Sequence, residues 1–191
     1  IHGEWVAALV GAAFVGAALA AMFSGLFRYP PDSGNPRFIV MNPGYSALRK
    51  GRHSRAGQIY LVTFTTARRQ CHFAEWRVAS DAARWLSAPA NWPNANLLAW
   101  VLMSDHWHGL IELRGDSCLS TSVGDCKGRT ARALRISHPW LGPIWCPGFH
   151  DRAMRRSDEL KAAARYLLNN PVRAGLVQRI GEYPFWDAIW L

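Results

Sequence analysis

The sequence has only four cysteines, Cys71, Cys118, Cys126 and Cys146, and no two of them form a CxxC pair. Their spacings match neither a zinc knuckle nor the disulfide framework of a small secreted domain. Cys146 lies four residues before His150, so a zinc site is conceivable, but its other ligands would be scattered along the chain. We therefore expect reduced, buried thiols in a cytosolic protein.

Acidic residues are also scarce, since 13 aspartates and glutamates stand against 22 lysines and arginines, for a formal net charge of +9. Residues 1–40 add nothing to this excess, because Glu4 and Asp32 offset Arg28 and Arg37. The excess on residues 41–191 favours a domain that binds a polyanion, with an ordinary basic protein as the alternative. No internal repeat is visible. The ten tryptophans exclude global disorder, and a length of 191 residues indicates one compact domain.

Charge is absent altogether from residues 5–27, a run that at about 1.5 Å per residue is long enough to cross a bilayer. No lysine or arginine precedes it, so it is a poor secretory signal. The composition turns basic and polar at Met41, after a proline- and glycine-rich stretch. We favour a misassigned start as the origin of residues 1–40, with a membrane anchor as the alternative. For the rest we expect a cytoplasmic, nucleoid-associated protein.

From Met41 onward the pattern predicts a small α+β domain. It begins with a basic arm, continues with strands at 58–66, 96–104 and 107–114, and has helices at 72–89, about 117–136 and 158–170. Only Asp105 and His106 separate the last two strands, so these should form an antiparallel hairpin. Pro171 should bias Asn170 out of the helical region and so end the last helix. The order of elements predicts an antiparallel sheet with helices packed on one face.

A pair of histidines, His106 and His108, flanks Trp107 at the start of the last predicted strand. Alternate side chains of a strand share a face, so both imidazoles should point to one side and Trp107 to the other. Two imidazoles that project together can clamp a metal ion. Two ordinary surface histidines would give the same HxH pattern, but this pair follows an apolar strand at a turn, where sites are commonly built.

A tyrosine and an asparagine lie one turn apart on the clearest predicted helix. Leu160, Ala164 and Leu167 form its apolar stripe, and Tyr166 lies about 100° from Leu167, on the flank of that stripe. Asn170 falls one turn further along on the same side. Tyr166 could simply pack against the core. Its hydroxyl is also a candidate nucleophile, and the amide oxygen of Asn170 is a candidate ligand for a hard cation.

Four segments occur in order along the chain: MSDHWHGLIEL, CKGRTARAL, IWCPGFHDRAMR and ARYLLNNPVRAGLV. Together they resemble the REP-associated tyrosine transposases, a branch of the single-tyrosine HUH endonucleases related to insertion-sequence transposases. The resemblance extends from about Met41 to Leu191, and residues 1–40 have no counterpart in it. It implies a ferredoxin-like or RRM-like α+β fold, with one catalytic domain over residues 41–191.

The resemblance also implies a role for each matching residue. His106 and His108 correspond to the paired histidines that act in catalysis and bind the metal, Tyr166 to the nucleophile, and Asn170 to the polar residue that completes the metal site. The implied cofactor is Mg²⁺ or Mn²⁺. The implied activity is cleavage and joining of hairpin-bearing single-stranded DNA, such as repetitive extragenic palindromes, through a 5′-phosphotyrosine, with no small-molecule substrate.

Three alternatives remain at this point, and the oligomeric state, monomer or dimer, is open as well. The chain could be a catalytically inactive DNA-binding descendant of the same fold, a membrane-anchored protein built around residues 5–27, or a metal-dependent RNA nuclease. The intact His106, His108, Tyr166 and Asn170 favour an active enzyme over an inactive descendant. An RNA nuclease would form no covalent adduct with a tyrosine.

Basic side chains outside this site are the candidate DNA contacts. Positions 129, 132 and 135 recur every three residues, so a helix would turn them toward phosphates, with a merely solvated face as the alternative. The many tryptophans and tyrosines could stack bases. His150 is a candidate base for activating the phenol, whose ordinary pKa of about 10 is high. The candidate DNA-binding residues are Arg49, Lys50, Arg52, Arg55, Lys127, Arg129, Arg132 and Arg135.

Overall fold

The computed structural model describes residues 54–154 and 157–190. The segment 1–40, with its apolar run, lies outside the described residues, as do Arg49, Lys50 and Arg52. Within the described ranges, no helix is long and apolar enough to cross a membrane.

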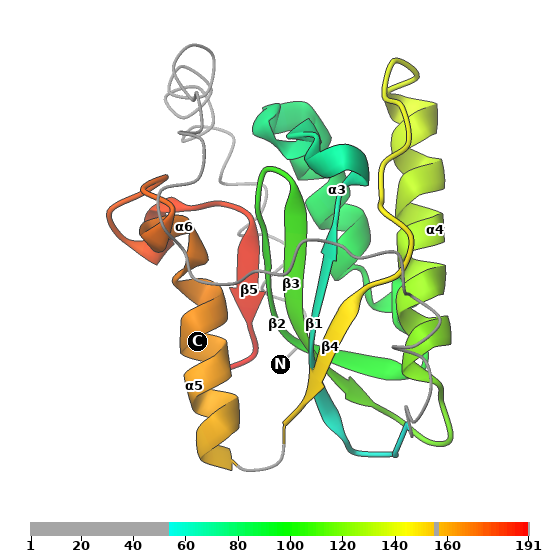
Figure 1. Ribbon diagram of the computed structural model, residues 1–191, viewed down its shortest axis with the longest axis vertical. Helices are drawn as coiled ribbons and strands as arrows, with labels where there is room; N and C mark the ends of the chain where they lie inside the picture. Colours follow the sequence, from blue (N-terminus) through cyan, green and yellow to red (C-terminus); the bar gives the residue numbers. More distant parts are fainter. Residues whose placement is uncertain (1–53, 155–156, 191) are drawn as a thin grey trace. The chain divides into compact units, whose positions relative to one another are not determined.

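Five strands form one antiparallel sheet in the order β4-β1-β3-β2-β5 (Figure 1). β3 lies at its centre, between β1 and β2. The three predicted strands and the predicted hairpin are present, whereas β4 and β5, with four and three residues, are too short to show an alternating pattern. The strands are Ile59–Thr65 (β1), Ala95–Leu102 (β2), His106–Leu113 (β3), His150–Ala153 (β4) and Trp186–Ala188 (β5).

Helices cover both faces of the sheet. Two long helices contact each other on one side, a third packs against β2 and β3 on the other, and a short helix follows it (Figure 1). They are Trp76–Ser87 (α3), Leu119–Ser137 (α4), Ser157–Leu168 (α5) and Asn170–Arg173 (α6). Single 3-10 turns occupy Ala67–Arg69, His72–Ala74, Pro89–Asn91 and Ile180–Glu182.

The α+β class and the antiparallel sheet are confirmed, but the prediction of helices on one face only was wrong. Trp107 and Ile111 on one face of β3 and Leu110 on the other are all fully buried, so both faces need a cover. Pro171 also does not end the helical region. α5 ends at Leu168, and Asn170 begins α6 with Pro171 in its first turn, where the missing N–H is tolerated.

The core on the α3 side contains an aromatic stack centred on Trp107. Its indole stacks on Phe64, with ring centroids 4.8 Å apart, and on Trp92, at 5.9 Å. It also lies directly over Gly109, two residues along the same strand face. A Cβ added at Gly109 would come within 2.0 Å of the Trp107 ring, so only glycine leaves room for this packing. The stack fixes the part of β3 that carries both histidines.

Candidate active site

The two histidines share the face of β3 opposite to Trp107, as the strand alternation predicts. In the sheet register, His106 lies opposite Thr65 and His108 opposite Thr63 on β1. The two imidazole rings are perpendicular to each other, and their centroids are 4.7 Å apart. His108 is buried and His106 is partly buried. The pair therefore forms a compact polar group at one end of the central strand.

His108 is held by a hydroxyl of the neighbouring strand. Its Nδ1 lies 2.6 Å from Thr63 Oγ1. Burial lowers the pKa of His108 well below its usual 6.5, and the nearby charges of His106 and Arg69 lower it further. The ring is therefore neutral at neutral pH. When Nδ1–H donates to Thr63, Nε2 presents its lone pair, which is the form of histidine that binds a metal ion.

His106 is held by a carboxylate. Its Nδ1 lies 2.6 Å from Asp105 Oδ1, and the other oxygen of Asp105 forms an ion pair with Arg69 Nε at 3.0 Å. Burial raises the pKa of Asp105. The hydrogen bond from His106 and the charges of His106 and Arg69 outweigh that effect and hold this pKa below its ordinary value. The carboxylate is thus ionised and keeps the Nδ1 proton of His106 in place.

Among the described residues, neither histidine uses Nε2 in a hydrogen bond. Two imidazoles on one strand face, each fixed through Nδ1 and each with an unengaged Nε2, have the arrangement of paired metal ligands. The described part of the chain contains no group of three or more histidines, cysteines or acids placed to hold a metal ion. A metal bound here would need its other ligands from different groups, such as an amide oxygen, water or a phosphate.

The supporting arginine comes from a loop with unusual backbone geometry. Arg68 and Arg69 both have positive φ, 55° and 56°, a left-handed conformation that side chains other than glycine seldom adopt. Thr66 anchors this loop, because its Oγ1 donates to the carbonyls of Gln70 (2.7 Å) and Asp105 (3.1 Å). Left-handed residues at successive positions concentrate at functional sites. Here they accompany the ion pair between Arg69 and Asp105.

Tyr166 lies in the last turn of α5. β4 runs antiparallel to β1, so α5 starts at the far end of the sheet and runs back toward the end where His106 lies (Figure 1). The Tyr166 side chain is 39% exposed, and its ring carries the Arg173 guanidinium at 4.5 Å from the centroid. Ala164 and Leu167 of α5 are buried, so the predicted apolar stripe is correct, and Tyr166 lies at its flank.

Asn170 joins α5 to α6. Its side-chain Nδ2 donates to Leu167 O at 2.9 Å and, more weakly, to Tyr166 O at 3.4 Å. These bonds use the amide nitrogen and fix the side chain against the turn that carries Tyr166. The Oδ1 atom has no hydrogen bond among the described residues and remains available as a ligand oxygen.

His150 begins β4 and lies on the histidine face as well. Thr63 pairs with His108 on one side and with His150 on the other, so the three residues stand in a row across adjacent strands. Side chains of directly paired residues point to the same face of a sheet. His150 is exposed. Its placement beside the pair was not evident from the sequence, because it depends on the pairing of β4 with β1.

The candidate DNA contacts fall into two kinds. Arg55, Arg129, Arg132 and Arg135 are exposed. Lys127 is not on their face, and this part of the prediction was wrong. Its Nζ is buried, donates to the carbonyls of Cys146 (2.8 Å) and Gly148, and lies 5.4 Å from the Phe64 ring centroid. Burial lowers the pKa of Lys127 to about 8.

The cysteines are all unpaired, but the expectation that they are buried holds only in part. Cys126 is buried, and burial raises the pKa of its thiol to about 12, whereas Cys71 and Cys118 are exposed. The conceivable zinc site around Cys146 and His150 has no support within the described residues, where no suitable ligand group exists.

The comparisons with known proteins agree with this architecture. Residues 54–170 match the family described as IS200-like transposases, and the chain belongs to that family. It is 28% identical over 88 residues to the REP-associated tyrosine transposase of Escherichia coli (strain K12). That match covers 46% of this chain and 50% of the relative, so the chain spans about half the length of this curated protein.

A solved structure shares the fold. The structure of a REP-associated tyrosine transposase bound to a REP hairpin superposes with a TM-score of 0.56 at 23% identity, and the match covers 71% of this chain and 79% of the other. At that identity the likeness establishes the fold alone. It agrees with the predicted α+β class and with the five-stranded antiparallel sheet.

Proposed function

We propose that this chain is a metal-dependent single-stranded DNA endonuclease and strand transferase that acts on hairpin DNA through a 5′-phosphotyrosine. The carrying observation is the histidine pair, with Nδ1 of His106 engaged by Asp105 and Nδ1 of His108 by Thr63. Such support is not expected of two surface histidines, and it leaves both Nε2 atoms for a ligand. Membership of the IS200-like transposase family makes DNA the expected substrate.

The residues present fit a divalent metal ion. His106 and His108 would hold it through Nε2, and Asn170 Oδ1 would add a hard oxygen ligand of the kind that Mg²⁺ and Mn²⁺ accept. When bound, such an ion withdraws charge from a phosphate oxygen and orients the phosphodiester. The neutral state of His108 favours binding, because no proton has to be displaced from Nε2.

Tyr166 is the proposed nucleophile. Its Oη attacks the phosphorus, the Oη–P bond forms, and the bond from phosphorus to the 3′ oxygen breaks. The phenolic proton is lost and the departing 3′ oxygen gains one. Because the phosphoester is retained on the tyrosine, a 3′ hydroxyl can reverse the step and join strands without a nucleotide cofactor.

His150 is the proposed proton acceptor for the phenol. It is exposed and lies on the same face of the sheet as the two histidines. Its strand, β4, is separated from β3 by β1. An imidazole is the usual general base near neutral pH. Arg173, stacked on the Tyr166 ring, places a positive charge beside the proposed nucleophile.

The DNA substrate is proposed to be a hairpin with a single-stranded extension. The solved relative with the same fold is bound to a REP hairpin, and this domain carries a large positive excess. Arg129 already donates to Ala90 O and lies 3.9 Å from Asp125, so Arg132 and Arg135 are the arginines of α4 best able to reach phosphates. The arm residues Arg49, Lys50, Arg52 and Arg55 are proposed as further contacts.

The direct test is a denaturing gel of protein incubated with hairpin-bearing single strands from its own genomic neighbourhood. Wild type should form a covalent adduct, and Tyr166→Phe should bind the strand but form none. Tyr183→Phe is the matched control, because the Tyr183 hydroxyl donates to Leu102 O in the core and its loss should lower stability without removing the adduct. An adduct in Tyr166→Phe would place the nucleophile elsewhere.

Metal dependence is tested on the same reaction. A chelator should abolish the adduct, and added Mg²⁺ or Mn²⁺ should restore it. His106→Ala and His108→Ala should each slow cleavage by at least about 100-fold. DNA binding without an adduct at any metal concentration would support the alternative, an inactive DNA-binding descendant of the same fold.

A further inference from the structure

The proposed nucleophile and the histidine pair lie on the same side of the sheet. α5 packs against β2 and β3 on the face that carries His106 and His108, whereas α3 and α4 cover the Trp107 face (Figure 1). The sheet therefore separates the arginines of α4 from a phosphate bound at the histidines. α5 and α6, rather than α4, are the helices placed to contact this phosphate.

Arg173 of α6 lies over the Tyr166 ring, with its guanidinium carbon 4.5 Å from the ring centroid. The two residues are seven positions apart, which in an unbroken helix is about 10.5 Å along the axis. The helix is broken between them, because α5 ends at Leu168 and α6 begins at Asn170. Asn170 ties the two helices together through the bond from its amide to Leu167 O at 2.9 Å. This break places the cation of α6 at the proposed nucleophile of α5.

The N–H groups of Arg173 have no partner in the part of the chain that the structure describes. Neither an ion pair nor a hydrogen bond joins its guanidinium to any described residue. By contrast, Arg69 is paired with Asp105 and Arg179 with Glu182. Arg173 is exposed, and contact with an aromatic ring leaves the N–H donors at the rim of the guanidinium free. Such a rim can bind a phosphate through two parallel hydrogen bonds.

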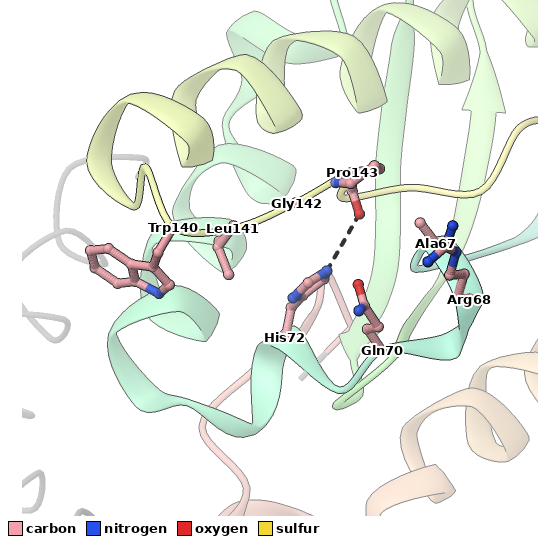
Figure 2. A pocket seen from close by; sticks show the side chains of 8 residues that line it. All are labelled: Ala67, Arg68, Gln70, His72, Trp140, Leu141, Gly142 and Pro143. Atoms are coloured by element: carbon pink, nitrogen blue, oxygen red, sulfur yellow. Dashed lines mark hydrogen bonds between the residues drawn. The ribbon is translucent and has the colours of Figure 1, made fainter.

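The cavity shown in Figure 2 does not involve this cation. It has a volume of about 300 Å³ and lies between the segment 140–143 and the side chains of Gln70 and His72. No residue of α5 or α6 lines it. Tyr166 and Arg173 are instead exposed on the surface, where a long polyanion such as DNA can reach both at once.

The position of the guanidinium over the ring suits a phosphate under attack. In a near-attack arrangement the phosphorus lies about 3–3.5 Å from the attacking oxygen. An aryl phosphoester is bent at its oxygen, so the phosphorus stands to one side of the ring. A phosphate that approaches from the side of Arg173 therefore brings a non-bridging oxygen within reach of the guanidinium. Donors already in place stabilise the charge that develops on such an oxygen.

We propose that Arg173 binds a non-bridging oxygen of the phosphodiester that Tyr166 attacks, and so acts as a catalytic residue. The inference rests on the proposed function, because it assigns a further contact to the same reaction. Arg173 stays protonated throughout, and the bonds that form and break are those between phosphorus, Tyr166 Oη and the 3′ oxygen. The contact is to a phosphate, so it should not depend on the bases that flank the cleaved bond.

The first test is the single-turnover rate of adduct formation at saturating Mn²⁺ and saturating hairpin DNA with a single-stranded extension. Arg173→Ala should lower this rate by roughly 100- to 1,000-fold, the scale for loss of one preorganised donor. Guanidinium ion at a non-denaturing concentration should partly restore it. Arg173→Lys should give an intermediate rate, because an ammonium keeps the charge but lacks the planar fork. Arg165→Ala is the matched control, since Arg165 is exposed on α5 but does not lie over the Tyr166 ring, and it should keep the wild-type rate.

The second test places a methylphosphonate at the cleaved bond, which replaces one non-bridging oxygen by a methyl group in each of two diastereomers. One diastereomer should slow wild type by about the same factor as Arg173→Ala does and should slow that variant little further, because both changes remove one contact. The other should slow both proteins equally. The same comparison is made on binding affinity in the Tyr166→Phe background, with the methylphosphonate moved along the extension, and this measurement needs no cleavage.

The outcomes separate this inference from the proposed function. Non-additive effects of the arginine and the methylphosphonate at one position support the contact. A wild-type rate in Arg173→Ala, or a slow rate with additive methylphosphonate effects, overturns the role of Arg173 and leaves the proposed function standing. If wild type forms no adduct, the proposed function fails and the binding comparison decides on Arg173. Additive effects at every position would then overturn the contact as well.

Discussion

Replacing Asp105 with asparagine tests whether the histidine pair is prepared for a metal ion. In wild type the ionised Asp105 accepts the Nδ1 proton of His106 at 2.6 Å, which places the lone pair of the neutral imidazole on Nε2. Asparagine has nearly the same shape but no charge. Its amide nitrogen can turn toward His106 and donate to Nδ1, which moves the ring proton to Nε2 and blocks metal binding there.

The magnitude follows from the local environment. The Asp105 and His106 side chains are only 14% and 15% exposed, so water screens their interaction weakly. Loss of a carboxylate behind a ligating histidine typically weakens metal binding by about 10- to 100-fold, or about 1.4–2.7 kcal/mol. We expect Asp105→Asn near the upper end, because Arg69 also loses its ion-pair partner.

The assay is single-turnover cleavage of a hairpin substrate as a function of Mn²⁺ concentration, with thermal unfolding measured on the same samples. Asp105→Asn should shift the half-maximal metal concentration upward and retain partial activity at saturating metal. The matched control is Asp81→Asn, since Asp81 holds His138 in a similar pair at 2.9 Å outside the histidine site. It should change stability at most and leave the titration where it was.

Two results would refute the reasoning. If Asp105→Asn titrates like wild type, the carboxylate does not govern the metal-binding form of His106. If Asp81→Asn shifts the titration by the same factor, the effect is a general loss of stability and not a property of the site. A shift confined to Asp105→Asn, with little change in melting temperature, supports the pairing seen in the structure.

Three further predictions follow from burial and packing. Lys127→Met should lower the free energy of unfolding by about 1–3 kcal/mol and leave the salt dependence of DNA binding unchanged, whereas Arg132→Ala should flatten that log–log slope by about 0.7 with stability intact. His108 has a folded-state pKa well below 6.5, so below about pH 6.5 the unfolded chain gains a proton that the folded chain does not. The free energy of unfolding, measured with urea in the presence of chelator, should therefore fall by up to about 1.4 kcal/mol for each unit that the pH is lowered in this range. His108→Gln should lack this contribution. Gly109→Ala should destabilise by about 1–3 kcal/mol through its clash with the overlying indole, while Gly128→Ala, with nothing within 4 Å, should stabilise by about 0.5–1 kcal/mol.

The sequence was sufficient to predict the histidine pair because its signal is local. Alternation on one strand places His106 and His108 together whatever the rest of the fold does. Their partners differ in this respect. Thr63 is 45 residues from His108, and only the register of β1 against β3 brings them into contact. The position of the Arg69 side chain depends on a left-handed backbone conformation that the residue pattern does not predict. Asp105, adjacent to His106, is the one partner that the sequence could have suggested.

The burial of Lys127 can be predicted from the sequence of α4. Positions 129, 132 and 135 recur every three residues and form an exposed face, and Lys127 does not belong to that series. On α4 the buried positions Val123, Cys126, Lys127, Thr130 and Leu134 are spaced by three, one, three and four residues, the pattern of a helix face that packs inward. A lysine within such a stripe needs acceptors, and the carbonyls of Cys146 and Gly148 supply them.

The two halves of the proposed site are held by different means, and this bears on how the enzyme would work. The histidines lie on the central strand, and Trp107 between them is locked into the aromatic stack on the other face, so their positions derive from the core. Tyr166 lies on α5, which packs against the sheet through residues that include the buried Ala164 and Leu167. The Tyr166 ring itself is substantially exposed. Substitutions on the buried face of α5 should therefore alter the rate of attack at saturating metal. Substitutions of the residues that hold the histidines should instead alter metal affinity. A site divided in this way lets the phosphate be bound before the nucleophile is brought to it.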